Sequence, residues 1–393
     1  MTSTTTSAST PAAVVPASPS SSRRIPELDG LRGLAVLGVV LFHYFSSSNF
    51  GARGTALGYF VKIFGLGWTG VDLFFILSGF LIGGILLETR ESPRFFRTFY
   101  LRRVHRILPI YFLLIFTYAV MVSLPARWFP AVLDVGGSSL AVVPGYLFFV
   151  QNFYFETRYF QGIFFSVTWS LALEEQVYLA APPLVRILSP RLLKRAVIAT
   201  ILIAPLLRCL LFVQANDWHY LAVQEMPSRA DELALGVGCA ILWGTPGFRE
   251  YLAQHQKLLY RAFFASALAI VALLWWFLHP SSIVTVSIGY TVLAVFYATL
   301  MLVVLTDTPG LLARFTRLKI LRDLGEISYC VYLIHVLVLF FCFGFLLHTE
   351  PRIYDWRGLA VTLLAFVLTM VLAKLSWRYY ERPMVRRGHR YSY

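Results

Sequence analysis

Hydrophobic residues fill this chain in long runs that short polar segments separate. Eleven such runs approach the roughly 20 residues that an α-helix needs to cross the hydrocarbon core of a bilayer. They lie near 28–46, 68–87, 107–124, 140–152, 166–188, 196–213, 229–245, 262–278, 285–305, 326–347 and 358–378. The 140–152 run is the weakest, because it is short, contains Pro144 and Gly145, and leads into the polar aromatic sequence QNFYFETRYFQG.

The basic residues between the runs indicate whether 140–152 crosses the membrane. If it does not, both chain ends share one side with the segments 88–106, 189–195, 246–261 and 306–324, and this side holds most of the arginines and lysines. Cytoplasmic segments carry such an excess, and a span at 140–152 would abolish it. We therefore predict an all-α polytopic membrane protein with about ten transmembrane helices and both termini in the cytoplasm. Residues 140–165 then form an extracytoplasmic element, either outside the bilayer or re-entrant.

Composition supports the membrane assignment and divides the chain into three parts. Of the 393 residues, 58% are hydrophobic and 14% are charged, whereas soluble domains contain about 25% charged residues. Basic loops and anionic lipid account for the net charge of +14, so no nucleic-acid partner is expected. The four cysteines lie inside apolar runs without metal-ligand spacing, so we expect neither a metal nor a disulfide framework.

We predict a disordered Ser/Thr/Ala/Pro-rich tail (1–24), a membrane domain (25–380) and a basic tail (381–393), with both tails cytoplasmic.

The first span, within RIPELDGLRGLAVLGVVLFHYF, carries Asp29, Arg32 and His43. Arg32 and His43 are eleven positions apart, close to three helical turns, so they share one helix face about 16 Å from each other. An ionisable side chain inside a span usually faces a cavity or a partner. The alternative is that Arg32 extends to the membrane surface and pairs with Asp29, while His43 is a packed interior histidine.

Two further motifs place charge near or inside the predicted spans. Arg103 and Arg106 lie one helical turn apart in RFFRTFYLRRVHRILPIYF, where two guanidinium groups suit phosphate binding or, alternatively, anchor the chain to lipid headgroups. Glu174 and Glu175 lie within the fourth span, and Tyr178 shares a face with Glu174. A structural carboxylate–arginine pair is the alternative for these carboxylates.

Polar residues also occur in the sixth and ninth spans. Arg229, Asp231 and Glu232 in SRADELALGVG lie at the predicted extracytoplasmic edge, where a simple polar interface is the alternative to a binding site. Tyr332 and His335 belong to SYCVYLIHVL. Single histidines of this kind are more often packed than catalytic.

These motifs together resemble the membrane-bound acyltransferase 3 family. The resemblance rests on LDGLRGLAVLGVVLFHY, GWTGVDLFFILSGFLI, FYLRRVHRILPIY, WSLALEEQVYL and ISYCVYLIH, which follow the family's order over about residues 26–380. It implies a ten-helix enzyme that moves an acyl group, commonly acetyl from acetyl-CoA, to a hydroxyl. Typical acceptors are envelope glycans, lipid-linked saccharides and macrolide-type small molecules. Because the chain ends at Tyr393, we expect a stand-alone enzyme without the C-terminal hydrolase-like domain of some relatives.

The resemblance also assigns site residues. The family's key histidine corresponds to His43, its first-helix arginine to Arg32, its RxxR pair to Arg103 and Arg106, and its WSLxxE carboxylate to Glu174. The three arginines are then expected to bind the phosphates of cytoplasmic acyl-CoA. His43 is expected to remove a proton from the acceptor hydroxyl, with Glu174 orienting His43 or positioning the acceptor. An acyl-histidine intermediate is the competing mechanism.

Arg229 and Asp231 are the candidate contacts to the acceptor, at the far edge of the same membrane domain. The expected location is the plasma membrane, as a multi-pass protein that contacts lipid, and no metal cofactor is predicted. Two other functions fit parts of the pattern. A proton-coupled transporter would use the buried Arg, His and Glu as a relay, and a sensor would bind acyl-CoA without turnover.

Overall fold

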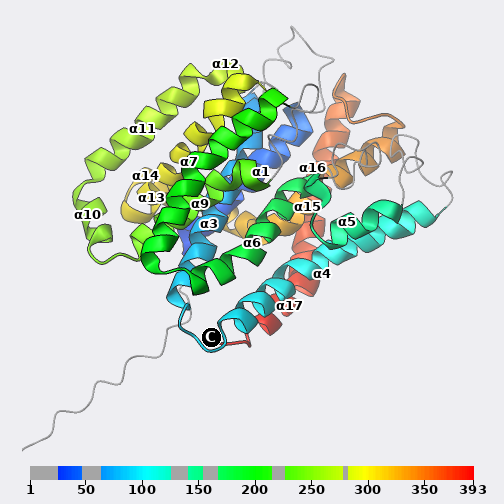
Figure 1. Cartoon of the computed structure of the whole chain (residues 1–393). Coiled ribbons are helices and arrows are strands. Elements are labelled where there is room, and N and C mark those ends of the chain that lie inside the picture. Colours follow the sequence, from blue (N-terminus) through cyan, green and yellow to red (C-terminus); the bar gives the residue numbers. More distant parts are fainter. Residues whose placement is uncertain (1–24, 47–62, 125–139, 154–166, 215–225, 278–281) are drawn as a thin grey trace, which may run out of the picture.

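The fold is helical throughout the described residues. The structure, a computed structural model, describes residues 25–46, 63–124, 140–153, 167–214, 226–277 and 282–393 (Figure 1). In its first half the helices are α1 (Pro26–Leu41), η1 (Phe42–Ser46), η2 (Ile63–Thr69), α3 (Gly70–Glu88), α4 (Phe95–Ser123), η6 (Leu140–Val142), α5 (Val143–Leu147), η7 (Gln151–Phe153), α6 (Trp169–Ile187) and α7 (Pro190–Gln214). The second half contains α9 (Met226–Trp243), α10 (Phe248–Gln254), α11 (Gln256–Ala272), α12 (Leu274–Phe277), η10 (Thr285–Gly289), α13 (Tyr290–Thr306), α14 (Leu311–Thr316), α15 (Lys319–Leu347), α16 (Trp356–Ser376), η11 (Trp377–Glu381) and α17 (Arg382–Gly388).

Seven helical segments among the described residues are long and apolar enough to cross a membrane. They are Pro26–Ser46, Phe64–Glu88, Phe95–Ser123, Pro190–Val213, Thr285–Thr306, Lys319–Leu347 and Trp356–Gly388. The other three predicted spans coincide with α6, α9 and α11. These are also helices, but α6 and α9 each carry three charged residues and α11 has only 17 residues. The all-α, polytopic prediction is confirmed, while the count of ten spans and the side of the termini stay predictions.

The 140–152 run does not form a transmembrane helix. It contains short helical turns, the longest of five residues, which rise far less than a bilayer core requires. This part of the chain packs against the middle of α4, where the Tyr111 hydroxyl donates to the carbonyl of Tyr146 (3.0 Å) and the Tyr111 ring stacks on Phe149 at 4.7 Å. Gln176 of α6 donates to the carbonyl of Phe149 (2.8 Å). Protein side chains therefore donate to two carbonyls of this irregular backbone, the kind of contact that a re-entrant element requires.

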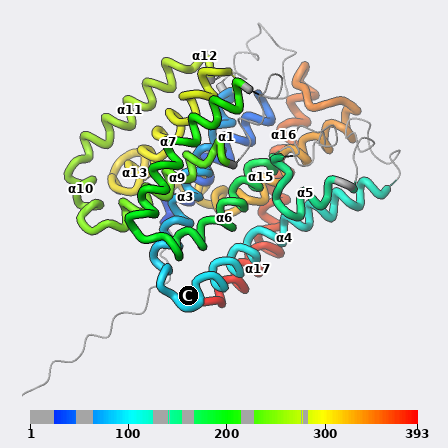
Figure 2. The backbone as a smooth tube through the Cα atoms, in the orientation of Figure 1, coloured from blue at the N-terminus to red at the C-terminus, as the bar shows by residue number. Residues whose placement is uncertain are grey.

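Helices α1 and α3 occupy the centre of the fold, between α7, α9, α11 and α13 on one side and α4, α15 and α16 on the other (Figure 2). Glycines allow the backbones at two crossings to touch. A Cβ atom on Gly325 of α15 would lie 1.9 Å from the main-chain oxygen of Asp29, and one on Gly79 of α3 would lie 2.1 Å from that of Leu233 in α9. Such close approach through small residues is typical of helix packing in membranes, and it brings the start of α1 directly against α15.

The C-terminal residues dock on the beginning of α4 (Figure 1). The Arg102 side chain donates to the carbonyl of Tyr391 (2.9 Å), and Thr98 donates to that of Ser392 (2.9 Å). Arg102 also lies over the ring of Tyr393, 4.9 Å from its centroid. The predicted basic tail is thus attached to the same end of the molecule as the arginines of the 88–106 segment. The predicted N-terminal tail, 1–24, lies outside the described residues.

Candidate functional site

An internal cavity brings four of the sequence-predicted site residues together. Arg32 of α1, Arg103 and Arg106 of α4, and Glu174 of α6 all line it, and its empty volume of about 670 Å³ includes space open to solvent. Helices α3 and α15 complete the wall with Phe74, Phe75, Ser78, Ser328, Tyr329 and Tyr332. We call this space the arginine cavity. Its residues come from five helices, so it exists only in the folded bundle.

The arginine cavity is electropositive. Arg32, Arg103 and Arg106 repel one another, and the largest repulsion on Arg106 comes from Arg32. The carboxylates of Asp29 and Glu174 attract Arg32. Glu174 is the single carboxylate among the lining residues that the structure describes. Three guanidinium groups and one carboxylate between apolar walls attract an anion, and guanidinium groups are well suited to bidentate contacts with phosphate.

The Glu174 carboxylate is held in place by neighbouring hydroxyls. Ser78 of α3 donates to Oε1 at 3.0 Å and Tyr178, one turn further along α6, donates to Oε2 at 3.1 Å. The Arg103 guanidinium lies over the Tyr178 ring, 5.5 Å from its centroid. The helix-face prediction for Glu174 and Tyr178 is therefore confirmed. Both oxygens of the carboxylate have a fixed direction inside the cavity.

His43 lies at a second location, in the π-helical turn η1 that follows α1. Its Nδ1 atom is 2.9 Å from the carbonyl oxygen of Val39 and 3.1 Å from Nε2 of His335 in α15. The two rings are 4.9 Å apart at their centroids, and His335 is fully buried. Sequence reasoning interpreted His335 as a packed histidine. The sequence does contain a signal for His335, because a histidine inside a membrane span is as unfavourable at position 335 as at position 43.

Tyr332 separates the histidine pair from the arginine cavity. Its ring lines the cavity on one side and lies 5.9 Å from the ring of His335 on the other. The hydroxyl is fixed by the carbonyl of Val167 at 3.0 Å and by Ser170 Oγ at 2.6 Å. The structure therefore gathers Arg32, the RxxR pair and Glu174 in one cavity, and places His43 beyond a tyrosine wall.

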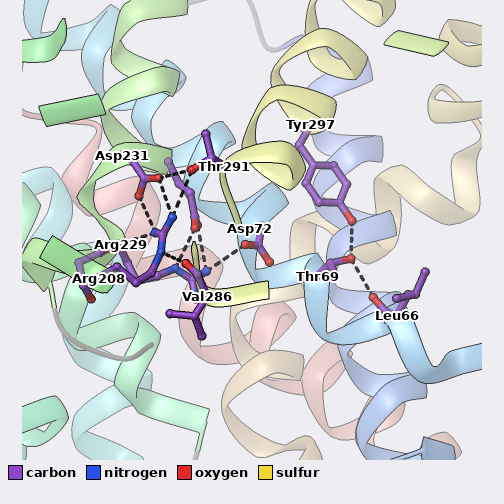
Figure 3. Close-up of polar contacts among 11 residues, drawn as sticks. Leu66, Thr69, Asp72, Arg208, Arg229, Asp231, Val286, Thr291 and Tyr297 are labelled. Atoms are coloured by element: carbon purple, nitrogen blue, oxygen red, sulfur yellow. Dashed lines mark hydrogen bonds and ion pairs between the residues drawn. The ribbon is translucent and has the colours of Figure 1, made fainter. Parts of the chain in front are cut away.

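The two predicted acceptor contacts belong to a separate, buried ion cluster (Figure 3). Arg229 pairs with Glu232 (2.8 Å) and with Asp72 of α3 (2.9 Å), and Asp231 pairs with Arg208 of α7 (3.1 Å). All five side chains are at most 2% exposed. We call this group the ion cluster. Acceptor binding by Arg229 and Asp231 stays a prediction, and neither Arg208 nor Asp72 was predicted as a site residue.

The ion cluster reaches the wall of the arginine cavity. The Arg229 guanidinium lies 3.9 Å from the ring centroid of Tyr290 and 5.6 Å from that of Phe75, which lines the cavity. Among the described residues no group of three or more His, Cys, Asp or Glu side chains is arranged to hold a metal ion.

Comparisons with known proteins identify the family of the chain. The model of a family described as "Acyltransferase domain" matches residues 25–378. The chain is 27% identical to the peptidoglycan O-acetyltransferase OatA of Listeria monocytogenes, over 94% of this chain and 57% of that protein. It is 25% identical to the O-acetyltransferase OatA of Staphylococcus aureus, over 94% of this chain and 58% of that protein. The chain thus spans less than two thirds of the length of these relatives. No solved structure matches it.

Proposed function

Since the chain belongs to the family described as an acyltransferase domain, we propose that it is an integral-membrane O-acyltransferase acting on a carbohydrate hydroxyl. The observation that carries the proposal is the arginine cavity, where Arg32, Arg103 and Arg106 meet a single carboxylate, Glu174. The names of the relatives favour acetyl as the acyl group, and one of them names peptidoglycan as the acceptor. Lipid-linked saccharides and macrolide-type molecules offer the same reacting hydroxyl.

Acyl-CoA is the proposed donor. Its phosphates would neutralise the guanidinium groups of the arginine cavity through charge-assisted hydrogen bonds. The beginning of α4 lies beside the basic C-terminal residues, an end of the molecule that the positive-inside rule assigns to the cytoplasm. The proposal therefore places the cavity within reach of cytoplasmic CoA in the plasma membrane. The acyl-bearing arm would extend past Tyr332 towards His43, from Arg32 on α1 to the π-helical turn η1 that follows it.

His43 is the proposed general base. A neutral imidazole has a lone pair on one ring nitrogen, so His43 can accept the proton of the acceptor hydroxyl while the hydroxyl oxygen attacks the thioester carbon. An ester bond forms, the carbon–sulfur bond breaks, and the CoA thiolate leaves and takes up a proton. In the competing route the acyl group is first bonded to His43 and then moves to the hydroxyl.

Glu174 and the ion cluster receive supporting roles. The Glu174 carboxylate is fixed by Ser78 and Tyr178 and faces the arginine cavity, so we assign it to positioning the reactants there. Arg229 and Asp231 already have charged protein partners. Their proposed main role is to hold the helices around the site, and direct acceptor contact is a second proposal that requires an acceptor hydroxyl to reach this buried cluster.

The central experiment measures acyl transfer by the purified protein. Radiolabelled acetyl-CoA and soluble peptidoglycan fragments are incubated with wild type and with His43→Ala, and both CoA release and labelled glycan are followed. Loss of a general base lowers the rate about 10²- to 10⁴-fold, and we expect a loss in this range. His255→Ala changes an exposed histidine between α10 and α11; it is the matched control and should keep wild-type activity. Full activity of His43→Ala would refute its assigned role.

The ion cluster supports a second candidate, a proton-coupled transporter, because five buried charges can form a relay. This candidate predicts proton movement in sealed vesicles that contain the purified protein, and no transfer of label from acetyl-CoA. A CoA-binding sensor predicts instead that binding of CoA survives in His43→Ala and that wild type forms no product. Labelled product that depends on His43 contradicts both.

A further inference from the structure

We propose that His335 is a positioning residue for His43: its Nε2 atom accepts the Nδ1 hydrogen of His43 and so directs the basic nitrogen, Nε2, to the reaction. The inference rests on the proposed function, because it concerns the base of that reaction. It is carried by the acceptors that lie next to the Nδ1 atom of each ring, which determine where the hydrogens lie.

The tautomer of His335 follows from its contacts with α15. Its Nδ1 atom lies 2.7 Å from the carbonyl oxygen of Tyr332 and 3.1 Å from that of Val331. Both neighbours are acceptors, so the hydrogen belongs on Nδ1. A neutral imidazole with this hydrogen has its lone pair on Nε2. The opposite tautomer would set a nitrogen lone pair against two carbonyl oxygens.

The tautomer of His43 follows in turn. Its Nδ1 atom faces the carbonyl oxygen of Val39 at 2.9 Å and the lone pair on His335 Nε2 at 3.1 Å. Two acceptors again require a hydrogen on Nδ1, which leaves the lone pair of His43 on Nε2. A buried carboxylate performs the same function for the histidine of serine proteases. Here a neutral ring holds the tautomer without adding a negative charge to the membrane interior.

The surrounding side chains keep the histidine pair rigid. Tyr44, the residue after His43, donates its hydroxyl to the main-chain carbonyl of His335 at 2.9 Å and lies 2.8 Å from Thr369 Oγ1 of α16. The hydroxyl therefore joins η1, α15 and α16 at one point. The Tyr332 ring covers another side of His335.

This arrangement has a direct consequence for the reaction. When Nε2 of His43 takes a proton from the acceptor, the ring becomes an imidazolium whose Nδ1–H still points to His335 and Val39. The two acceptors then stabilise the new charge as it develops. Without the His335 nitrogen, the Val39 carbonyl is the one remaining named acceptor that favours a hydrogen on Nδ1 of His43, and the fraction of rings with a basic Nε2 falls.

The test compares two substitutions in the full-length protein. His335→Gln offers an amide oxygen as acceptor close to the position of Nε2, whereas His335→Leu offers none. We expect kcat to fall about 100-fold in His335→Leu, within the range of general-base contributions, and to recover most of this loss in His335→Gln. The KM for acetyl-CoA should stay at the wild-type value in both, because His335 does not line the arginine cavity. Thermal unfolding in detergent compares the folding of the two variants.

A spectroscopic arm measures the tautomer itself. Nitrogen-15 NMR of histidine-labelled wild type, with the His43 signals identified from their loss in His43→Gln, should show a protonated Nδ1 and an unprotonated Nε2. The opposite tautomer in wild type would overturn the inference, and so would wild-type kcat in His335→Leu. Equal impairment of two well-folded variants would show that ring shape matters rather than the acceptor, which also overturns it. If wild type transfers no acetyl group, the proposed function fails separately, and the spectrum alone decides the tautomer assignment.

Discussion

At the scale of single residues, the environment of each intramembrane charge identifies its role. An ionisable side chain in an apolar environment is unfavourable unless it has a partner or a polar cavity. Arg208 meets this requirement through Asp231, with both side chains almost fully buried. Arg32 and Arg106 line a cavity in which they repel each other, while the nearby Asp29 carboxylate attracts both. The cavity arginines are therefore the ones that an anionic ligand would stabilise.

Arg106→Gln tests this distinction. Hydrogen bonds to charged groups contribute about 1.5–3 kcal/mol, so the KM for acetyl-CoA should rise about 10- to 100-fold while kcat changes little. Steady-state kinetics over a range of acetyl-CoA concentrations measures both constants. Arg102→Gln is the matched control, because Arg102 bonds the carbonyl of Tyr391 and lies outside the cavity lining. An equal rise in KM in both variants would point to a general effect of basic charge.

At the scale of elements, the apolar runs predict where helices lie but not at which residue each helix begins. The 358–378 and 285–305 runs closely match α16 and the η10–α13 pair. Helix α4 instead begins at Phe95, twelve residues before its predicted run, because arginines are good helix formers although they are not apolar. The π-helical turns η1 and η10 were not predicted. They carry His43 and present the carbonyl of Val286 to Arg208 at 2.7 Å, in keeping with the frequent occurrence of π-turns at functional sites.

The sequence predicts those parts of the candidate site whose residues lie close together along the chain. Arg103 and Arg106 are neighbours on one turn, so the sequence shows their shared face directly. The His43–His335 contact joins residues 292 positions apart, and the Asp72–Arg229 pair joins residues 157 apart. No pattern along the chain specifies which distant helices meet. Arg208 was not predicted either, although it is the one charged residue in the apolar run 196–213 and a charge there needs a partner.

The ion cluster joins α3, α7 and α9, so its main effect should be on stability. Arg229→Met leaves Asp72 and Glu232 without their cation, and breaking such a buried pair costs about 3–5 kcal/mol. We expect a clear fall in the unfolding temperature in detergent. Lys319→Met removes the cation of an exposed pair with Asp323, 3.9 Å apart, and should change stability by less than about 1 kcal/mol. A raised KM for the acceptor at unchanged stability would support direct acceptor contact instead.

At the scale of the whole molecule, the docked C-terminus constrains the topology. Thr98 and Arg102 at the start of α4 bond the carbonyls of Ser392 and Tyr391, so the start of α4 and the C-terminal residues lie on one side of the membrane. The chain between them must therefore cross an even number of times. Five of the long apolar helical segments lie in this interval, starting with Phe95–Ser123. If all five cross and the rest of the interval adds no span outside α6, α9 and α11, an odd number of these three more polar helices crosses as well, and the predicted ten spans use all three.

Cysteine accessibility in intact cells tests this topology. Single cysteines replace exposed residues in the first turn of α4 (Arg97), in the first turn of α7 (Arg191), in α10 (Glu250) and at the start of α16 (Arg357). With ten spans, a membrane-impermeant maleimide should label only Arg357→Cys in intact cells, and all four after the cells are opened. The parent chain, whose described cysteines are buried or half-buried, measures background labelling. Labelling of Arg191→Cys in intact cells would show that α6 does not cross. In that case the segment that contains α6 would enter the membrane and leave it on the same side. Helix α6 would still have to place the Glu174 carboxylate beside Ser78 of α3, at the arginine cavity.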